Sequence, residues 1–237
     1  MKEILTVLQN FIIADESRLN HLKSDIGIKA TASVLGECEW VSNYKTELYL
    51  EEVETLYERY LDNYTLYNNL EDENFTWATS TLALLNKVKT PYVFYLIEDR
   101  MFHKTTKEEF TEIMDEVVKN DIGFMCLGKL HKYSLTQYPP RIQQMGGVPY
   151  MDNDKHIYTY FSKNSPYGCL SNDAIYRKDV LVKSLVRIIN SKEQIPRVLE
   201  YGPNWLTSGM PDMLCAVPKN EVVVSDDDPG YSLGVLK

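Results

Sequence analysis

Two carboxylates and a guanidinium follow a strongly apolar run near the middle of the chain. Residues 90–97 are mostly aromatic and β-branched, and Glu98, Asp99 and Arg100 come directly after them. The run predicts a strand that is buried on both faces. Because unpaired charge is costly in a protein interior, the charged residues should lie where the strand leaves the sheet. Ligands of open α/β sheets bind outside the carboxyl ends of the strands, so this segment predicts a binding site.

The segments around this run alternate between strand and helix patterns. Strands are predicted at residues 4–13, 30–41, 64–67, 90–97 and 124–130, and helices at residues 18–26, 48–61, 76–88, 106–120 and 179–190. The helices carry apolar residues three or four positions apart, whereas the strands are short apolar runs between turn residues. Asp15 or Ser17 is expected to cap the first helix. Residues 132–165 are predicted to be irregular because proline and glycine interrupt them.

This order of elements predicts a Rossmann-like α/β fold. Strand–helix alternation implies right-handed crossovers and a mostly parallel central sheet flanked by helices. At 237 residues the chain is long enough to bury one substantial core. No internal repeat or low-complexity linker interrupts it, so we predict a single domain spanning residues 1–237.

Composition excludes several classes of partner. The net charge of −9 argues against nucleic acid and against tight adsorption on anionic lipid. No apolar run reaches the length of a transmembrane segment, and the first residues lack the features of a signal peptide, so a cytoplasmic location is expected. The four cysteines have no CxxC spacing and are predicted to be reduced and mostly buried. The acidic surface leaves a homodimer open.

Three stretches resemble GT-A fold glycosyltransferases, the family-2-like enzymes that use nucleotide sugars and build bacterial surface polysaccharides. They resemble, in order, the asparagine-rich turn with a small-residue helix start, the strand that ends in a DxD-type acidic motif, and the acceptor-side segment where a strand returns before a helix. The stretches are Tyr67-Asn68-Asn69-Leu70 with Asn74-Phe75-Thr76-Trp77-Ala78, then residues 91–99, then residues 168–181 with Ser171-Asn172-Asp173-Ala174 and Arg177-Lys178-Asp179-Val180-Leu181. The resemblance implies a single GT-A-like domain with a nucleotide-sugar-binding half at residues 1–102 and an acceptor-side half at residues 103–237.

The resemblance assigns roles to the acidic motif. It implies that Glu98 faces the ribose or sugar hydroxyls and that Asp99 is the ligand of a divalent cation, Mn²⁺ or Mg²⁺. Such a cation bridges the diphosphate oxygens and neutralises the charge that develops on them. Arg100 stands where many relatives carry another aspartate, and a guanidinium there could bind the diphosphate directly instead. Both alternatives stay open, as does a simple ion pair that closes the end of the strand.

Further donor-binding candidates lie in the N-terminal half. They are Asn10, Arg18, Glu37, Glu39, Asn74 and Trp77. Glu37 and Glu39 are expected to follow the second strand and to contact the base or the ribose, and Arg18 is a candidate for the nucleotide phosphates. The structural alternatives are turn formation for Asn74, an exposed helical position for Arg18 and core packing for Trp77.

An inverting transfer also needs a general base for the acceptor hydroxyl. Glu200 is the first candidate, because it lies after the acceptor-like segment, where the family often supplies a carboxylate. Asp173 is the second. A surface or helix-capping acid is the alternative for Glu200. Residues 226–228 are three adjacent aspartates before a Pro-Gly turn, which predicts a solvated loop.

Together these features predict a hexosyltransferase-like enzyme. It would move a sugar from a nucleotide-sugar donor to a glycan or lipid-linked acceptor in polysaccharide biosynthesis. A nucleotidyltransferase on a related sheet would need a glycine-rich phosphate loop after the first strand, and residues 1–26 contain no glycine. The remaining alternative is a catalytically degenerate GT-A-like module that binds a glycan or a partner enzyme, an alternative that Arg100 keeps open.

Overall fold

The computed structural model describes residues 1–68, 76–97, 100–102, 104–127, 149–152, 155–161, 174–195, 198–199, 206, 212–218, 220 and 222–225. The strands are β1 (Leu5–Phe11), β2 (Glu39–Tyr44), β3 (Tyr64–Asn68), β4 (Tyr92–Tyr95), β5 (Arg100–Phe102), β6 (Phe124–Cys126), β7 (Pro149–Asp152), β8 (His156–Phe161), β9 (Ala174–Arg177), β10 (Met213–Pro218) and β11 (Val223–Ser225). The helices are α1 (Glu16–Lys23), α2 (Ile28–Leu35), α3 (Leu50–Tyr60), α4 (Trp77–Leu85), α5 (Lys107–Lys119) and α8 (Lys178–Ile189).

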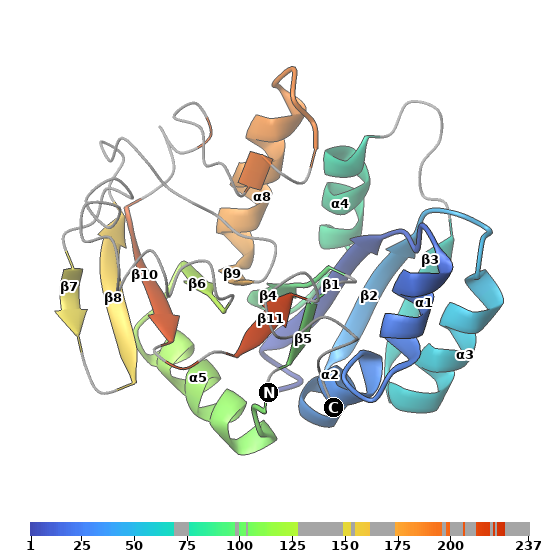
Figure 1. Cartoon of the computed structure of the whole chain (residues 1–237). Coiled ribbons are helices and arrows are strands. Elements are labelled where there is room, and N and C mark those ends of the chain that lie inside the picture. The colour runs from blue at the N-terminus through green and yellow to red at the C-terminus, as the bar shows by residue number, and fades with distance from the viewer. Residues whose placement is uncertain are drawn as a thin grey trace.

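One large sheet organises these elements (Figure 1). Its nine described strands lie in the order β3-β2-β1-β4-β9-β6-β10-β8-β7, and β11 and β5 form a separate two-stranded sheet. Strands β3, β2, β1 and β4 pair in parallel, while β9 and β8 run against their neighbours. The other seven strands of the large sheet therefore share one direction. This confirms the predicted α/β fold with a mostly parallel central sheet.

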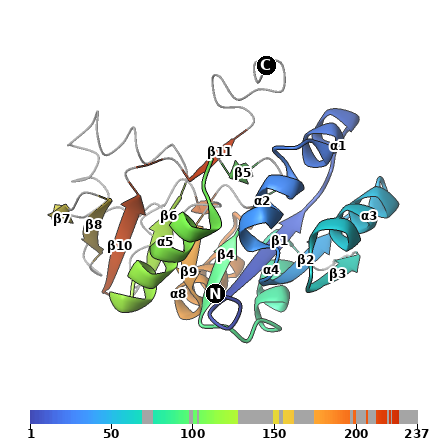
Figure 2. The same cartoon turned by 90° about the horizontal axis from the view of Figure 1, so that it is seen from below.

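Helices cover both faces of the sheet (Figure 2). Helices α1, α2, α3 and α5 contribute to one hydrophobic core, and α4 and α8 contribute to the other. Strand β1 separates the two cores: Leu5 and Val7 point into the first and Leu8 into the second. Successive side chains of a strand point to opposite faces, so a strand covered on both sides is apolar along its whole length.

Local sequence signals fix the starts of three helices. Asp15 caps α1, as predicted, by accepting a hydrogen bond from the Arg18 N–H at 2.9 Å. Helices α4 and α5 both begin with a reciprocal capping box, built from a threonine N-cap, Thr76 or Thr106, and the side chain three residues later. These caps satisfy backbone donors that have no acceptor within the helix.

Two predicted segments differ from the structure. The strand predicted at residues 30–41 is wrong: residues 28–35 form α2, and β2 begins only at Glu39. The buried residues of α2 are Ile28, Thr31, Val34 and Leu35, whose spacing of three or four is helical. Within the segment predicted to be irregular, β7 and β8 add two strands at residues 149–152 and 156–161. The pairing of β8 with β10 is non-local and leaves little local signal.

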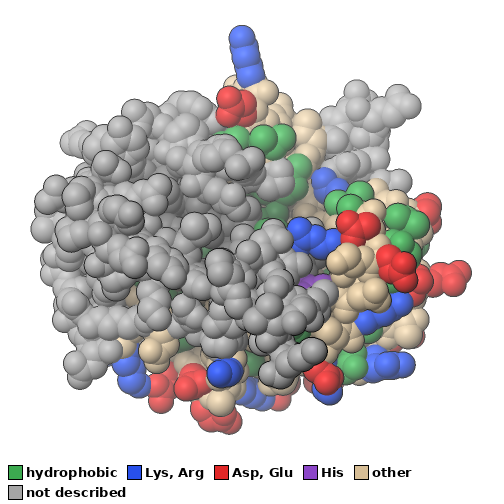
Figure 3. Space-filling model, viewed as in Figure 1, with side chains coloured by type: hydrophobic (Ala, Val, Ile, Leu, Met, Phe, Trp, Pro, Cys, Tyr) green, Lys and Arg blue, Asp and Glu red, His purple; other side chains and the backbone are tan. Residues whose placement is uncertain are grey.

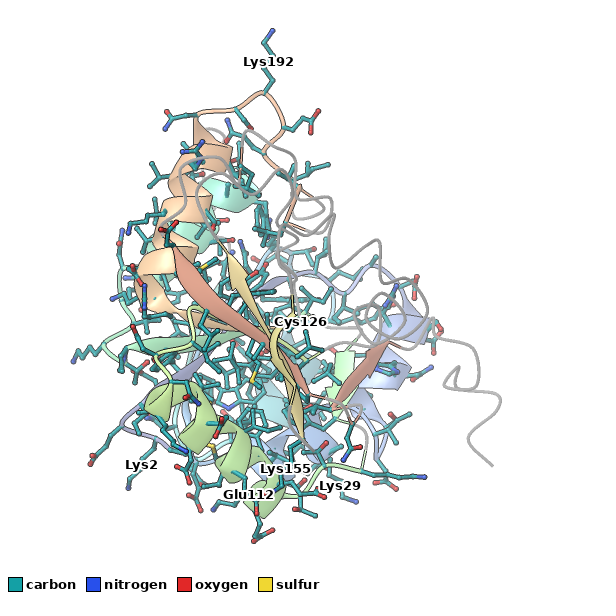
Figure 4. All side chains as sticks on the ribbon, turned by 90° about the vertical axis from the view of Figure 1, so that its left-hand side faces the viewer. Lys2, Lys29, Glu112, Cys126, Lys155 and Lys192 are labelled. Atoms are coloured by element: carbon teal, nitrogen blue, oxygen red, sulfur yellow. The ribbon has the colours of Figure 1, made fainter. Side chains whose placement is uncertain are left out.

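The surface carries charges of both signs. Figure 3 shows acidic and basic side chains interspersed on the described part of one face, where α1, α2, α3 and α5 reach the surface. Lys155, beside β8, forms an ion pair with Glu112 of α5, and Figure 4 shows the two together at one end of the molecule. Cys126 is buried, as Cys38 is. Within the described residues, no helix has the length and apolarity that crossing a membrane requires.

Candidate functional site at the carboxyl edge of the sheet

The order of the parallel strands marks one place on the sheet edge. From β1 the chain moves outward to β2 and β3, and it then returns to place β4 on the other side of β1. The boundary between β1 and β4 is therefore a topological switch point, where connections diverge and leave a crevice at the carboxyl ends. Beyond β4 the chain continues through Leu96 and Ile97, and Glu98 and Asp99 come next in the sequence. This acidic pair lies outside the described residues.

Asn10, near the end of β1, joins three elements at this edge. It is 4% exposed, and its Nδ2 donates to Ser80 Oγ and Thr81 Oγ1, both at 2.8 Å, and to the Trp77 carbonyl at 3.2 Å. Its Oδ1 accepts a hydrogen bond of 3.0 Å from Asn43, the residue opposite it on β2. Asn10 thus ties the first turns of α4 to the ends of β1 and β2.

The start of α4 is held by two further hydrogen bonds. Thr76 Oγ1 donates to Gln194 Oε1 at 2.6 Å, which connects the helix start to the segment after α8. Trp77 Nε1 donates to the Tyr95 hydroxyl at 2.9 Å, and Tyr95 is the last residue of β4. Helix α4 is therefore anchored to both strands of the switch point, β1 through Asn10 and β4 through Trp77.

A second polar group lies on the opposite face of β1. The Tyr57 hydroxyl, from α3, donates a short hydrogen bond of 2.5 Å to Gln9 Oε1 and lies 3.2 Å from Ser42 Oγ. All three residues are buried. Burial also raises the pKa of Tyr57, so the phenol stays protonated and remains a donor. The bond holds the Gln9 amide with its oxygen toward α3.

A small cavity opens beside Gln9. Its volume is about 10 Å³, which is room for one water-sized group. Gln9 lines it from β1 and Ile97 from the segment after β4, so the cavity spans the switch point. Gly27 and Ile28 line it from the start of α2. The remaining wall is mostly apolar, with Trp40 among its members.

Two of the predicted donor-binding residues lie at this edge with their polar atoms already engaged. Asn10 makes the network described above, and Trp77 is 7% exposed within the hydrophobic core. Both side chains therefore hold α4 against the sheet and have their polar atoms engaged within the protein. Arg18 is half-buried in the first turn of α1.

Glu37 and Glu39 lie at the opposite edge of the sheet. They were expected after the second strand, but Glu37 precedes β2 and Glu39 is its first residue. Glu37 is exposed and forms an ion pair with Lys107 of α5, and this hydrogen bond lowers the pKa of the carboxyl. Glu39 accepts a hydrogen bond of 3.2 Å from Thr6 Oγ1. The structure does not bring either residue to the switch point.

The side chains of the other candidates lie outside the described residues. Arg100 begins β5, where its backbone pairs with Ser225 of β11. Its side chain, and all of Asn74, Glu98, Asp99, Asp173 and Glu200, lie outside the described residues. Within the part of the chain that is described, no three His, Cys, Asp or Glu side chains come together as a metal site. The described residues therefore do not supply a site for the predicted cation.

Sequence reasoning missed Gln9, which lies beside Asn10 in an otherwise apolar strand. A polar pair at the carboxyl end of a strand that is buried on both faces is a usable signal, because buried polar groups need partners. The partners themselves carry no such signal. Tyr57 is 48 residues from Gln9 along the chain, and Ser80 is 70 residues from Asn10.

Comparisons with known proteins place this fold. No protein-family model matches the sequence, and the curated proteins yield no match either. Solved structures do match. TarS 1-349 of S. aureus, in complex with UDP-GlcNAc, is 13% identical with a TM-score of 0.54, over 94% of this chain and 58% of TarS 1-349. The mannosyltransferase PcManGT of Pyrobaculum calidifontis, in complex with GDP-Man and Mn²⁺, is 10% identical with a TM-score of 0.53, over 98% of this chain and 59% of the enzyme.

The chain has a GT-A-like fold. A third structure, HddC from Yersinia pseudotuberculosis, is 8% identical with a TM-score of 0.52 and matches over 97% of both chains. By contrast, this chain spans less than two thirds of the length of TarS 1-349 and of the mannosyltransferase. The GT-A-like fold explains the position of the switch point and of the strand that leads to Glu98 and Asp99. It leaves the chemistry to the side chains at the sheet edge.

Proposed function

We propose that the chain is a glycosyltransferase that moves a hexose from a nucleotide sugar to a glycan or lipid-linked acceptor in cytoplasmic polysaccharide biosynthesis. One observation carries this proposal. Strand β4, which leads to the acidic pair Glu98–Asp99, lies next to β1 at the switch point of a GT-A-like fold. Structures with this fold include TarS bound to UDP-GlcNAc and a mannosyltransferase bound to GDP-Man, which supports a nucleotide-sugar donor.

In this proposal the donor lies along the carboxyl edge of the N-terminal half, residues 1–102. Glu98 would contact ribose or sugar hydroxyls. Asp99 would hold Mn²⁺ or Mg²⁺, which would supply positive charge to the diphosphate, or the Arg100 guanidinium would bind the diphosphate directly. Asn10 and Trp77 position the site and do not contact the donor, since their polar atoms hold α4 against β1 and β4. Glu37 and Glu39 leave the proposed site, because they lie at the other edge.

The acceptor belongs to the second half, residues 103–237. Glu200, or Asp173 in its place, would take the proton of the acceptor hydroxyl if the transfer inverts the anomeric centre. The proton passes to the carboxylate as the acceptor oxygen bonds to the sugar, and the diphosphate leaves with the electrons of the broken bond.

Thermal unfolding tests the donor directly. The chain is heated with nucleoside diphosphates and their sugar forms, each with and without Mn²⁺. A ligand that binds only the native state adds about 2.7 kcal/mol at a hundredfold excess over its dissociation constant. One nucleotide that raises the midpoint alone would identify the donor base, and its dependence on Mn²⁺ would distinguish Asp99 from Arg100.

Turnover separates an enzyme from a binding module. Release of the nucleoside diphosphate from the sugar form that binds is followed in the wild type and in Asp99→Asn. We expect slow release that falls at least tenfold in the variant while the fold, checked by circular dichroism, is unchanged. Binding without release in any acceptor mixture would favour the catalytically degenerate module, and no binding at all would contradict both.

A further inference from the structure

The Gln9 side chain has one end fixed and the other end open. It is 5% exposed, its Oε1 accepts from Tyr57, and no described residue accepts a hydrogen bond from its Nε2. This Nε2 is not among the described buried polar atoms that lack a partner, so it remains accessible to a small group. Because Gln9 lines the switch-point cavity, the unused donor is available to whatever enters it.

The start of α2 adds a second source of donors. Ile28 begins this eight-residue helix, and Gly27 at its N-cap provides no side-chain cap. The first amides of a helix have no acceptor within it and carry a partial positive charge. Gly27 is required here because a Cβ at this position would lie 2.4 Å from the carbonyl oxygens of His21 and Leu22. The close approach of α1 and α2 places the uncapped helix start in the cavity wall.

Size and lining select the group that fits. Gln9 and the helix start offer hydrogen-bond donors, while Leu22, Trp40 and Leu96 make the surrounding wall apolar. The cavity has room for one water-sized group. It is therefore too small to hold a phosphate. Burying a charge among apolar side chains is costly as well. The occupant is therefore a single uncharged oxygen that accepts hydrogen bonds, such as a carbonyl or a hydroxyl.

We propose that Gln9 and the start of α2 form a subsite that binds one carbonyl or hydroxyl oxygen of the nucleotide sugar. The inference rests on the proposed function and adds a specificity-determining residue to it. Ile97 lines the cavity, and the acidic pair Glu98–Asp99 directly follows it in the sequence. Tyr57 is a positioning residue, since its hydroxyl engages the Gln9 Oε1 and leaves the Nε2 as the free end of an amide that lines the cavity.

The test compares Gln9→Met with a matched control. Methionine keeps the length of the side chain and removes its donors. The control is Thr6→Val, another change from a polar to an apolar residue in β1, at a fully buried position that does not line the cavity. Calorimetry measures the dissociation constants of UDP, UDP-GlcNAc, GDP and GDP-mannose. For the ligand that the wild type binds, we expect Gln9→Met to raise the dissociation constant about fivefold. Thr6→Val should change it less than twofold.

The ligand pairs locate the oxygen. A loss that is equal for the nucleoside diphosphate and its sugar form places the oxygen on the nucleotide. A loss confined to the sugar form makes it a sugar hydroxyl. Unchanged affinity in Gln9→Met would overturn the subsite and leave the proposed function intact. Absence of binding by the wild type to all four ligands would overturn both.

Nitrogen-15 NMR gives a readout that does not depend on a stable variant at Gln9. Tyr57→Phe removes the bond to Gln9 Oε1, and we expect it to shift one side-chain amide pair in the ligand-free spectrum. The same pair should move when the ligand is added to the wild type. If that pair stays in place on ligand addition while backbone signals move, the cavity holds a structural water only and the proposal is wrong.

Discussion

The two edges of the central sheet treat their polar groups differently. At the amino edge, charged side chains pair with one another: Glu37 with Lys107, and Arg177 with both Asp121 and Asp179 at 2.7 Å. At the carboxyl edge between β1 and β4, the described polar groups include uncharged, buried Gln9 and Asn10 in hydrogen-bond networks. These charged groups at the amino edge pair with one another. At the carboxyl edge, the Gln9 donor remains available to a ligand.

The comparison explains why polar groups at the two edges contribute differently to stability. Exposed pairs at the amino edge are screened by solvent and contribute little to stability. Buried amides at the carboxyl edge are far more costly to leave unpaired, so their geometry is strongly determined. A site that must hold a ligand in one orientation benefits from such a rigid frame.

The largest effect is expected from Asn10→Leu. The change leaves the Asn43 amide without its acceptor and removes the link between α4 and β1, so we expect a loss of about 2–4 kcal/mol in the free energy of unfolding. Thr6→Val, on the same face of β1 near the amino edge, should cost about 1 kcal/mol. Urea denaturation measures both, and equal losses would contradict the contrast between the edges.

Gly27→Ala and Gly123→Ala separate stability from binding. An added Cβ at Gly27 meets backbone oxygens at 2.4 Å, and at Gly123 it meets Met213 Sδ at 2.7 Å, so both variants should lose about 1–3 kcal/mol. Only Gly27 lines the cavity, and Gly123 precedes β6 at the amino edge. We expect nucleotide affinity to fall in Gly27→Ala alone. Equal nucleotide affinities in the two variants would contradict the proposal that the ligand occupies the cavity.

Acid unfolding tests the ion pairs at the amino edge. Burial opposes ionisation of Asp179, yet its hydrogen bond from Arg177 is strong enough to lower the pKa below the ordinary value of 3.8. A lowered pKa adds stability above pH 3.8, and this stability is lost as the pH falls through the folded-state pKa. Wild type should therefore lose more stability than Asp179→Asn between pH 5 and pH 2, as followed by circular dichroism. Parallel curves would show that the pair contributes nothing.

The smallest effect is expected from Glu37→Gln. The side chain is exposed, and its ion pair with Lys107 lies at the amino edge, so nucleotide affinity should stay within twofold of wild type. Calorimetry with the ligand that binds wild type is the measurement. A tenfold loss of nucleotide affinity would show that Glu37 belongs to the donor site. It would contradict the assignment of the ligand to the carboxyl edge alone.

Local patterns in the sequence were enough for most of the elements. Helix α5 shows the reason: Phe110, Ile113 and Val117 recur at helical spacing, and the capping box of Thr106 and Glu109 marks its start. The strand prediction for residues 30–41 was wrong because small and β-branched residues suit helix and strand alike. There the choice was made by burial of Ile28 and Leu35 against neighbours that are distant in the sequence.

The sequence alone determined the run of strands and helices, the acidic pair after β4 and the GT-A-like resemblance, because each depends on residues that are neighbours along the chain. Tertiary structure decided which polar residues share an edge. It moved Glu37 and Glu39 to the amino edge, engaged Asn10 with α4, and left the Gln9 amide facing a cavity. Hydrogen bonds between residues 48 and 70 positions apart depend on how the sheet is ordered, and no local periodicity encodes that order.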